Sequence, residues 1–322
     1  MTQQSKKREA APVKEHEPSR FGSYLSRYKP PTMIVRTMAG KKAGRKLRRL
    51  LRFLVSGIVA LLFCIGAWLL WRYHGPAAPV EIFQGITYGC ERLPDTTQSG
   101  GLLHWVRADL NVPGVSLYVT PCDPDAMSKG FEYKLNHTST SVADNGLAAA
   151  VNGTLFASDS SFIRLPGDLA NSSETIVADH VVNHIDPNSY LMWWSDDSIA
   201  HLERWKPPPP ESVAAAKWAI SGQAPMLRAN EHAQNSDVDQ RTIIAADPEK
   251  KLVWICCFDK ASYQFISYLL QSRRAKIAIA VDGGSSMAMA IGSGAKNVRS
   301  GTVTGNWRPV ATVFGFRAKP LR

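Results

Sequence analysis

The chain has 322 residues, a length typical of one or two domains, and a formal net charge of +11. The excess of basic residues is confined to its beginning, because residues 1–52 hold 15 of the 38 Lys and Arg but only three of the 27 Asp and Glu. The rest of the chain is close to neutral, with 23 basic and 24 acidic side chains. A nucleic-acid-binding domain normally carries basic charge on its own folded surface, so we expect no nucleic acid partner.

Residues 1–52 are polar and basic, a composition typical of a disordered segment. An uncharged run from Phe53 to Trp71 follows, long enough as a helix to span a hydrocarbon core of roughly 30 Å. Basic residues precede this run and aromatic residues end it, which by the positive-inside rule keeps the N-terminus in the cytoplasm. We therefore expect a single-pass inner (cytoplasmic) membrane protein whose C-terminal body is periplasmic or extracellular. A cleaved signal peptide is the alternative, but it usually has a shorter apolar region and a small-residue cleavage site.

Residues 72–84 are interpreted as a short stalk, and residues 85–322 as one domain of the α+β class, with mostly antiparallel sheets and few helices. The helix is expected at Ala261–Gln271, where apolar residues at 261, 265, 268 and 269 have helical spacing. Strands are expected at His104–Leu110, Val115–Thr120, Leu147–Val151, Ile176–Val182, Leu191–Trp194, Arg241–Ala246, Leu252–Phe258, Lys276–Val281 and Val310–Phe316.

The five cysteines do not have the spacing of a zinc site. Cys90 and Cys122 could form a disulfide in an oxidising compartment. Cys256 and Cys257 are adjacent in an apolar strand, so alternation predicts buried thiols on opposite faces of the sheet. Trp193 and Trp194 lie in a Trp-rich stretch and favour packing over a sugar-binding platform.

The segment Asp282-Gly283-Gly284-Ser285-Ser286 lies between two apolar runs. One interpretation is a β-hairpin, since Asp-Gly is a common hairpin turn. The other is a binding site, in which the glycines expose backbone N–H groups to an anion and the serines add hydroxyl donors. The carboxylate of Asp282 would then lie at the end of a strand and face an opening.

Further segments occur in a characteristic order. They are the strand and turn containing Asn152-Gly153-Thr154-Leu155-Phe156, the turn Ile220–Leu227, and two strand beginnings at Arg241 and Arg308. Together with the turn at Asp282, they resemble the phosphodiester glycosidase family over residues 85–316. The resemblance implies attack at the anomeric carbon of a sugar linked through a phosphodiester, which releases the sugar and leaves a phosphomonoester.

The resemblance implies roles for individual residues. Asp282 would stabilise the developing positive charge or activate water, and Arg241 would bind phosphate oxygens through its planar guanidinium. Asn152 would hold a sugar hydroxyl or orient water. The substrate-binding residues would be Arg308, Gly153, Gly283, Gly284, Ser285 and Ser286. We expect no cofactor, and the sequence does not show whether a metal is required.

Thr154 and Leu155 depart from the family, which usually has glycine and phenylalanine there. Thr154 disfavours the positive φ that glycine permits, so the floor of the site could differ. The expected substrate is a sugar-phosphodiester of an envelope polysaccharide or glycoconjugate. Two alternatives stay open, a non-catalytic polysaccharide-binding envelope factor and a phosphodiesterase that attacks phosphorus.

Overall fold

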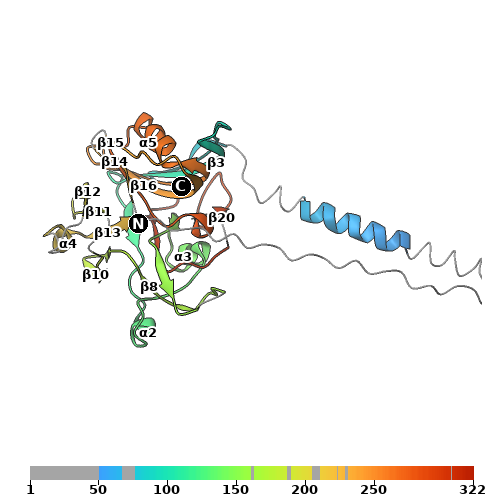
Figure 1. The fold of residues 1–322 in the computed structure, drawn as a ribbon, viewed down its shortest axis with the longest axis horizontal. Coiled ribbons are helices and arrows are strands. Elements are labelled where there is room, and N and C mark those ends of the chain that lie inside the picture. Colours follow the sequence, from blue (N-terminus) through green and yellow to red (C-terminus); the bar gives the residue numbers. More distant parts are fainter. Residues whose placement is uncertain are drawn as a thin grey trace, which may run out of the picture. The chain divides into compact units, whose positions relative to one another are not determined.

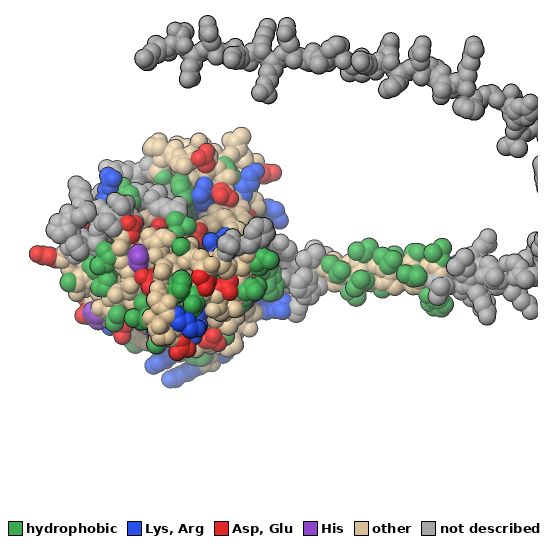
Figure 2. Space-filling model, turned by 60° about the horizontal axis from the view of Figure 1, so that its bottom comes forward, with side chains coloured by type: hydrophobic (Ala, Val, Ile, Leu, Met, Phe, Trp, Pro, Cys, Tyr) green, Lys and Arg blue, Asp and Glu red, His purple; other side chains and the backbone are tan. Residues whose placement is uncertain are grey.

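The computed structural model describes residues 51–66 and 77–322, except for 161–162, 187–189, 205–210, 223, 229–230 and 306. Contacts divide the chain into two units, Met1–Phe63 and Cys64–Arg322, which are treated separately. Residues 51–66 form a helix with hydrophobic side chains around its surface (Figure 2). No helix among the described residues is long and apolar enough to cross a membrane. Residues 67–71 of the expected span and most of the basic segment 1–52 lie outside the described residues. So do Trp205, which belongs to the same Trp-rich stretch as Trp193 and Trp194, and the four consecutive prolines at 207–210.

The described residues of the domain form four sheets in which every strand pair is antiparallel, with few helices (Figure 1). This confirms the expected mostly antiparallel architecture. The helices are α2 (Pro124–Met127), α3 (Thr138–Asp144), α4 (Glu211–Ala215), α5 (Tyr263–Ser272) and the 3₁₀ turn η1 (Gly284–Ser286).

The largest sheet has the order β1-β2-β3-β17-β16-β18-β14-β15. Its strands are β1 (Ala77–Phe83), β2 (Ile86–Arg92), β3 (Ser99–Asp109), β14 (Ala224–Arg228), β15 (Glu231–His232), β16 (Val238–Asp247), β17 (Leu252–Ser262) and β18 (Ile277–Ala280). A second sheet has the order β20-β19-β6-β21-β4. Its strands are β4 (Ser116–Val119), β6 (Ala149–Asn152), β19 (Ala288–Ile291), β20 (Gly301–Gly305) and β21 (Val313–Arg317).

A third sheet has the order β10-β9-β13-β11-β12, and a small fourth one has the order β5-β8-β7. The strands of the third are β9 (Ile176–Ala178), β10 (Val181–His184), β11 (Tyr190–Trp194), β12 (Ala200–Arg204) and β13 (Trp218–Gly222). Those of the fourth are β5 (Tyr133–Lys134), β7 (Phe156–Ser158) and β8 (Leu169–Ser172).

The central strands of the largest sheet are buried on both faces. Ile244 and Cys257 belong to the main core, which the second sheet completes with Val151 and Phe314. Ile243 and Cys256 belong to a separate core on the opposite face, under α5. Adjacent residues of one strand therefore enter different cores, as the pleat requires. The expectation for the two adjacent thiols is confirmed.

Helix α5 begins later than the sequence pattern indicated, because β17 extends through Ser262. The Ser262 hydroxyl then caps the helix by accepting a hydrogen bond from the Phe265 N–H at 3.1 Å. The buried face is Tyr263, Ile266, Ser267 and Leu270, whereas Tyr268 is 53% exposed. The expected apolar stripe was therefore wrong in its phase.

The expected stalk is shorter than residues 72–84, because residues 77–83 form β1 at the edge of the largest sheet. Ile82 and Phe83 are buried in the main core. Pro79 is tolerated because β1 is an edge strand, where a missing backbone N–H interrupts no central hydrogen-bond ladder. A proline is not typical of a strand, so the sequence pattern did not predict β1.

No disulfide joins Cys90 to Cys122 in the structure. The Cys90 sulfur lies 3.7 Å from the Nε2 atom of His104, a buried side chain whose Nδ1 atom lies 2.9 Å from the Tyr88 hydroxyl. Trp194 is completely buried, and Trp193 stacks on His201 with 4.0 Å between ring centroids. These contacts favour the packing role expected for both tryptophans.

Candidate active site

The loop that contains Asp282 connects two sheets and is not a hairpin. Strand β18 before it pairs with β14 and β16, whereas β19 after it pairs with β6 and β20. The hairpin interpretation was therefore wrong, since the two apolar runs are not hydrogen-bonded to each other. Gly284 has a φ of 53°, a conformation that favours glycine, and begins the 3₁₀ turn.

Asn152 fastens this loop to both sheets from inside the protein. Its side chain is completely buried, and its Nδ2 atom donates to the Asp282 carbonyl oxygen at 2.5 Å. Its Oδ1 atom accepts from the Thr242 hydroxyl at 2.8 Å and from the Ala288 N–H at 3.1 Å. Because these bonds tie β6, β16 and the loop together, the arrangement favours a positioning role for Asn152 over direct contact with substrate.

The strand end at Gly153 supports the same loop. The Asp282 N–H donates to the Gly153 carbonyl oxygen at 3.1 Å, and the Gly153 N–H donates to the Thr312 carbonyl oxygen at 2.8 Å. A side chain on Gly153 would collide with the Thr312 hydroxyl. Thr154 does not have a positive φ, so the strain expected there is absent, and its hydroxyl lies 3.0 Å from that of Ser172.

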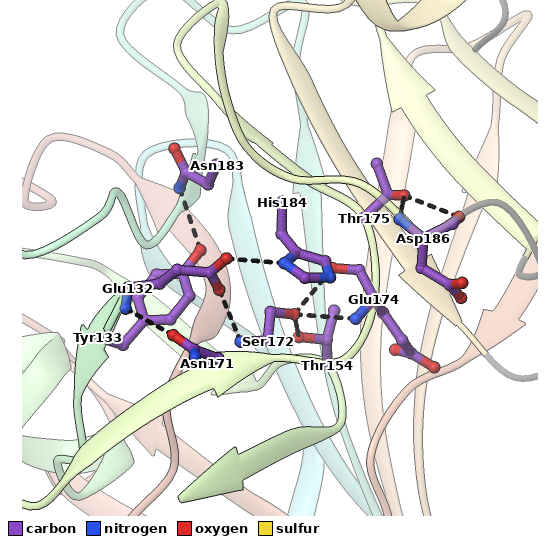
Figure 3. A network of polar contacts seen from close by, with 10 residues as sticks. All are labelled: Glu132, Tyr133, Thr154, Asn171, Ser172, Glu174, Thr175, Asn183, His184 and Asp186. Carbon is purple, nitrogen blue, oxygen red and sulfur yellow. Dashed lines mark hydrogen bonds and ion pairs between the residues drawn. The ribbon is translucent and has the colours of Figure 1, made fainter. Parts of the chain in front are cut away.

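A second carboxyl group, Glu174, lies near Asp282 and was not identified from the sequence. Glu174 is 4% exposed, between β8 and β9. Its backbone N–H and carbonyl both bond to the Ser172 hydroxyl, at 3.1 and 2.8 Å (Figure 3). Its Oε2 atom accepts from the Leu155 N–H at 3.4 Å. The stretch Asn171–Thr175 has no recognisable motif, so only the fold shows this residue.

Burial shifts the protonation of both carboxyl groups. Desolvation raises the pKa of Glu174 to about 8, and the negative charges of Asp282 and Asp186 add to the rise. Desolvation also raises the pKa of Asp282, opposed by hydrogen bonds from Ser286 and Gly283 and by the charge of Arg164. A pair of carboxyl groups in different environments is the usual basis of acid and base roles in one site.

The Ser172 hydroxyl that holds Glu174 belongs to a longer polar network (Figure 3). The Ser172 N–H donates to Glu132 Oε2 at 2.7 Å, and Glu132 Oε1 lies 2.7 Å from the Nδ1 atom of His184. Through Glu132 the network links Ser172 of β8 to His184 of β10, and the Ser172 hydroxyl fixes the turn that carries Glu174.

Two guanidinium groups lie close to the Asp282 loop. The guanidinium of Arg308 donates a hydrogen bond to the Ser285 hydroxyl and lies 5.9 Å from the centroid of the Phe156 ring. The Cζ atom of Arg164 lies 4.7 Å from the centroid of the same ring. Arg308 thus lies beside the loop as the resemblance implied, whereas Arg164 was not singled out.

Arg241 contacts a different partner. Its guanidinium lies over the Tyr263 ring at 4.1 Å from the centroid, and its Nη1 atom donates to the Tyr263 hydroxyl at 3.1 Å. Burial raises the pKa of Tyr263, and the negative charges of Asp239 and Glu174 add to the rise. The charge of Arg241 and its hydrogen bond lower the pKa of Tyr263. The backbone at Gln240–Arg241 packs directly against Gly283. Arg241 therefore lies beside the loop but within β16, which begins at Val238 and not at Arg241 as expected, and its role in phosphate binding stays a prediction.

The structure thus brings Asp282, its glycine and serine neighbours and Arg308 together, with Asn152 and Gly153 beneath them. Within the described ranges, no three His, Cys, Asp or Glu side chains are grouped so that they could hold a metal ion.

A sequence profile of the phosphodiester glycosidase family matches residues 145–317, and this range contains every candidate residue named above. The chain belongs to this family. A comparison with curated proteins found no match. The family range begins after β5, so the first strands of the largest sheet lie outside it.

Solved structures show the same fold at low sequence identity. A hypothetical protein from Synechocystis is 13% identical, with a TM-score of 0.59, and the match covers 76% of this chain and 64% of that protein. The auto-inhibited catalytic domain of zebrafish N-acetylglucosamine-1-phosphodiester alpha-N-acetylglucosaminidase is 14% identical, with a TM-score of 0.51. That match covers 76% of this chain and 86% of the zebrafish domain. At these identities the likeness extends to the fold alone.

Proposed function

We propose that the protein is a glycoside hydrolase that cleaves a sugar from a sugar-1-phosphodiester. The observation that carries the proposal is the pair of carboxyl groups, the buried Glu174 and the half-buried Asp282, beside the Arg308–Ser285 contact. Family membership supports a glycosidase-like hydrolase, and the geometry supplies the groups that such a reaction needs.

The two carboxyl groups divide the acid and base work. With a pKa of about 8, Glu174 is mostly protonated at pH 7 and can donate a proton to a phosphate oxygen. Asp282 is the carboxylate of the pair. Hydrogen bonds and the charge of Arg164 oppose the rise in its pKa that desolvation causes. In the reaction, water attacks the anomeric carbon and the carbon–oxygen bond breaks, with its electron pair passing to the phosphate oxygen. Asp282 accepts a proton from the water and stabilises the positive charge of the oxocarbenium-like transition state.

The phosphate needs less acid assistance than an ordinary sugar leaving group, because it is a weak base. Its main requirement is positive charge and hydrogen-bond donors. Arg308 and the Ser285 hydroxyl supply both at the loop, and a guanidinium matches two phosphate oxygens at once. Arg241 is a further candidate from the neighbouring strand.

The proposed setting is the cell envelope. The basic segment before residue 53 and the uncharged run at 53–71 support a signal anchor in the inner membrane, with the domain in the periplasm or outside the cell. The substrate is then a phosphodiester-linked sugar of an envelope polysaccharide, such as an exopolysaccharide, or of a glycoconjugate. The near-neutral composition of the domain supports a partner other than nucleic acid.

Hydrolysis of an N-acetylglucosamine-1-phosphodiester in ¹⁸O-labelled water by the full-length protein tests the proposal, with other sugar-1-phosphodiesters as further substrates. Label in the released sugar supports attack at carbon. Label in the phosphate would show a phosphodiesterase. Polysaccharide binding without hydrolysis of any of these diesters would show a binding factor.

A further inference from the structure

Two loops meet beside the Asp282 loop and are held to the same short segment. On one side, Leu135 exchanges backbone hydrogen bonds of 2.8 Å with Gly167 and Asp168, at the end of the loop that carries Arg164. On the other side, Asn136 exchanges backbone hydrogen bonds of 3.0 and 2.8 Å with Val310, two residues after Arg308. Residues 135 and 136 therefore fix the distance between the two loops.

The arginines of these loops turn toward one aromatic ring. Both guanidinium groups lie near the Phe156 ring, at 4.7 Å for Arg164 and 5.9 Å for Arg308. Arg308 also contacts Ser285, and the charge of Arg164 acts on Asp282. Two guanidinium groups near one ring repel each other, and Asp282 supplies only one negative charge beside them, so the arrangement is suited to a ligand with a phosphate group.

Large apolar side chains flank both arginines and are exposed. Ile163 is 69% exposed and Leu165 is 56% exposed, on either side of the half-buried Arg164. Trp307, next to Arg308, is 64% exposed, and its ring meets that of His137 edge-on. Single exposed apolar residues are common on proteins, but a group beside a charged site marks a surface that contacts a ligand.

We propose that Arg164 and Arg308 bind the phosphate of the substrate together, and that Ile163, Leu165 and Trp307 contact an apolar alcohol esterified to that phosphate. The inference rests on the proposed hydrolase function and specifies its substrate class, a sugar-1-phosphodiester with an apolar aglycone. The sugar would lie toward Asp282 and Glu174. The alcohol would extend from the phosphate along the exposed apolar side chains.

Binding of product analogues tests this without requiring turnover. Hydrolysis of the diester leaves an alkyl phosphate, so n-pentyl phosphate represents an apolar product. Glycerol 3-phosphate is its polar counterpart, with as many heavy atoms in the alcohol. We expect the full-length protein in detergent to bind pentyl phosphate about tenfold more tightly by calorimetry, because each buried methylene adds to the affinity. Equal affinities would overturn the apolar site.

Variants assign the effect to residues. The double variant Ile163→Ser, Leu165→Ser should lower the preference for pentyl phosphate to about threefold or less, because two of the three apolar contacts are lost and only Trp307 remains. The control Val181→Ser, Val182→Ser removes exposed apolar side chains from β10 and should keep the preference. A double variant at 163 and 165 that keeps the tenfold preference would contradict the proposal.

Arg164→Ala should weaken both phosphates about tenfold, since one charged hydrogen-bonding partner is removed. Arg317→Ala is the matched control, because Arg317 also lies 4.7 Å from an aromatic centroid, that of Tyr118, and should have no effect. Equal affinities of these two variants would overturn the arginine pair.

The outcomes separate this inference from the proposed function. Preferential binding of pentyl phosphate without hydrolysis of any sugar-1-phosphodiester would support the subsite and contradict the hydrolase. Hydrolysis at equal rates for pentyl and glycerol diesters would support the hydrolase and overturn the apolar subsite.

Discussion

Replacing Glu174 with glutamine should stabilise the protein and lower its turnover at the same time. Burial raises the pKa of this carboxyl group from an ordinary 4.5 to about 8. Between these values the folded state keeps a proton that the unfolded state releases, so the free energy of unfolding falls as pH rises. At about 1.4 kcal/mol per pKa unit, the loss is about 3 kcal/mol at pH 7 and about 5 kcal/mol above pH 8. Below pH 4.5 both states are protonated and the contribution is constant.

Glutamine has nearly the same shape and is neutral at every pH, and its oxygen can still accept the Leu155 N–H. We therefore expect Glu174→Gln to be more stable than the wild type by about 3 kcal/mol at pH 7 and nearly equal to it at pH 4. Turnover should fall about 10²-fold, because an amide cannot donate the proton. Urea unfolding of the full-length protein in detergent, followed by tryptophan fluorescence from pH 4 to 9, measures the difference.

The exposed Glu249 provides a control, since Glu249→Gln replaces a carboxyl group that folding does not bury and should not reproduce the stabilisation at pH 7. Parallel stability curves for Glu174→Gln and the wild type across this pH range would refute the reasoning. The carboxyl group would then ionise in the folded protein as it does in water, and the acid role proposed for it would lose its basis.

Asp282→Asn should keep the fold by circular dichroism and lose about 10²-fold or more in turnover, because an amide does not stabilise positive charge at the anomeric carbon; unchanged turnover would contradict its role. Arg241→Lys should lower kcat/KM on the same substrate, since lysine lacks the planar fork that bonds Tyr263 or phosphate, and wild-type kinetics would argue against a functional contact. Gly153→Ala should lower the urea midpoint, corresponding to roughly 1–3 kcal/mol, because its methyl group collides with the Thr312 hydroxyl; an unchanged midpoint would show that the strand end can relax. A C-terminal reporter fusion should be active only outside the cytoplasm, and cytoplasmic activity would exclude the proposed topology.

The sequence predicted the four central strands of the largest sheet, β3, β17, β16 and β18, because their apolar runs are buried on both faces, but it did not predict β2, β14 or β15. Adjacent residues such as Cys256 and Cys257 reach different cores, and this leaves a strong local pattern. The sequence did not predict the edge strand β1, which contains Pro79 and two alanines. It also predicted the wrong buried face for α5. The local pattern around Asp282 also favoured a hairpin. The pairing of β18 and β19 with different sheets depends on partners far away along the chain, which no local pattern encodes.

Some residues of the candidate site could be predicted from the sequence, and others could be found only from the fold. Asp282, its glycines and Arg308 lie in segments whose order resembles the family, and the structure places them together. Glu174 and Arg164 have no motif, and their importance comes from burial and from what lies beside them in the folded protein. The pKa of Glu174 is raised because the rest of the domain removes water from the carboxyl group and brings other negative charges near it.

The loop that joins β18 to β19 has a consequence for assembly of the protein. Its two ends belong to separate sheets, and Asn152 bonds to β16, to the loop and to Ala288 at the start of β19. A folding intermediate in which only one sheet has formed would lack the anchor on the other side, and Asp282 would be free to move relative to Glu174. Catalysis should therefore return during refolding in the last kinetic phase, when the two sheets dock, and later than the secondary structure of either one.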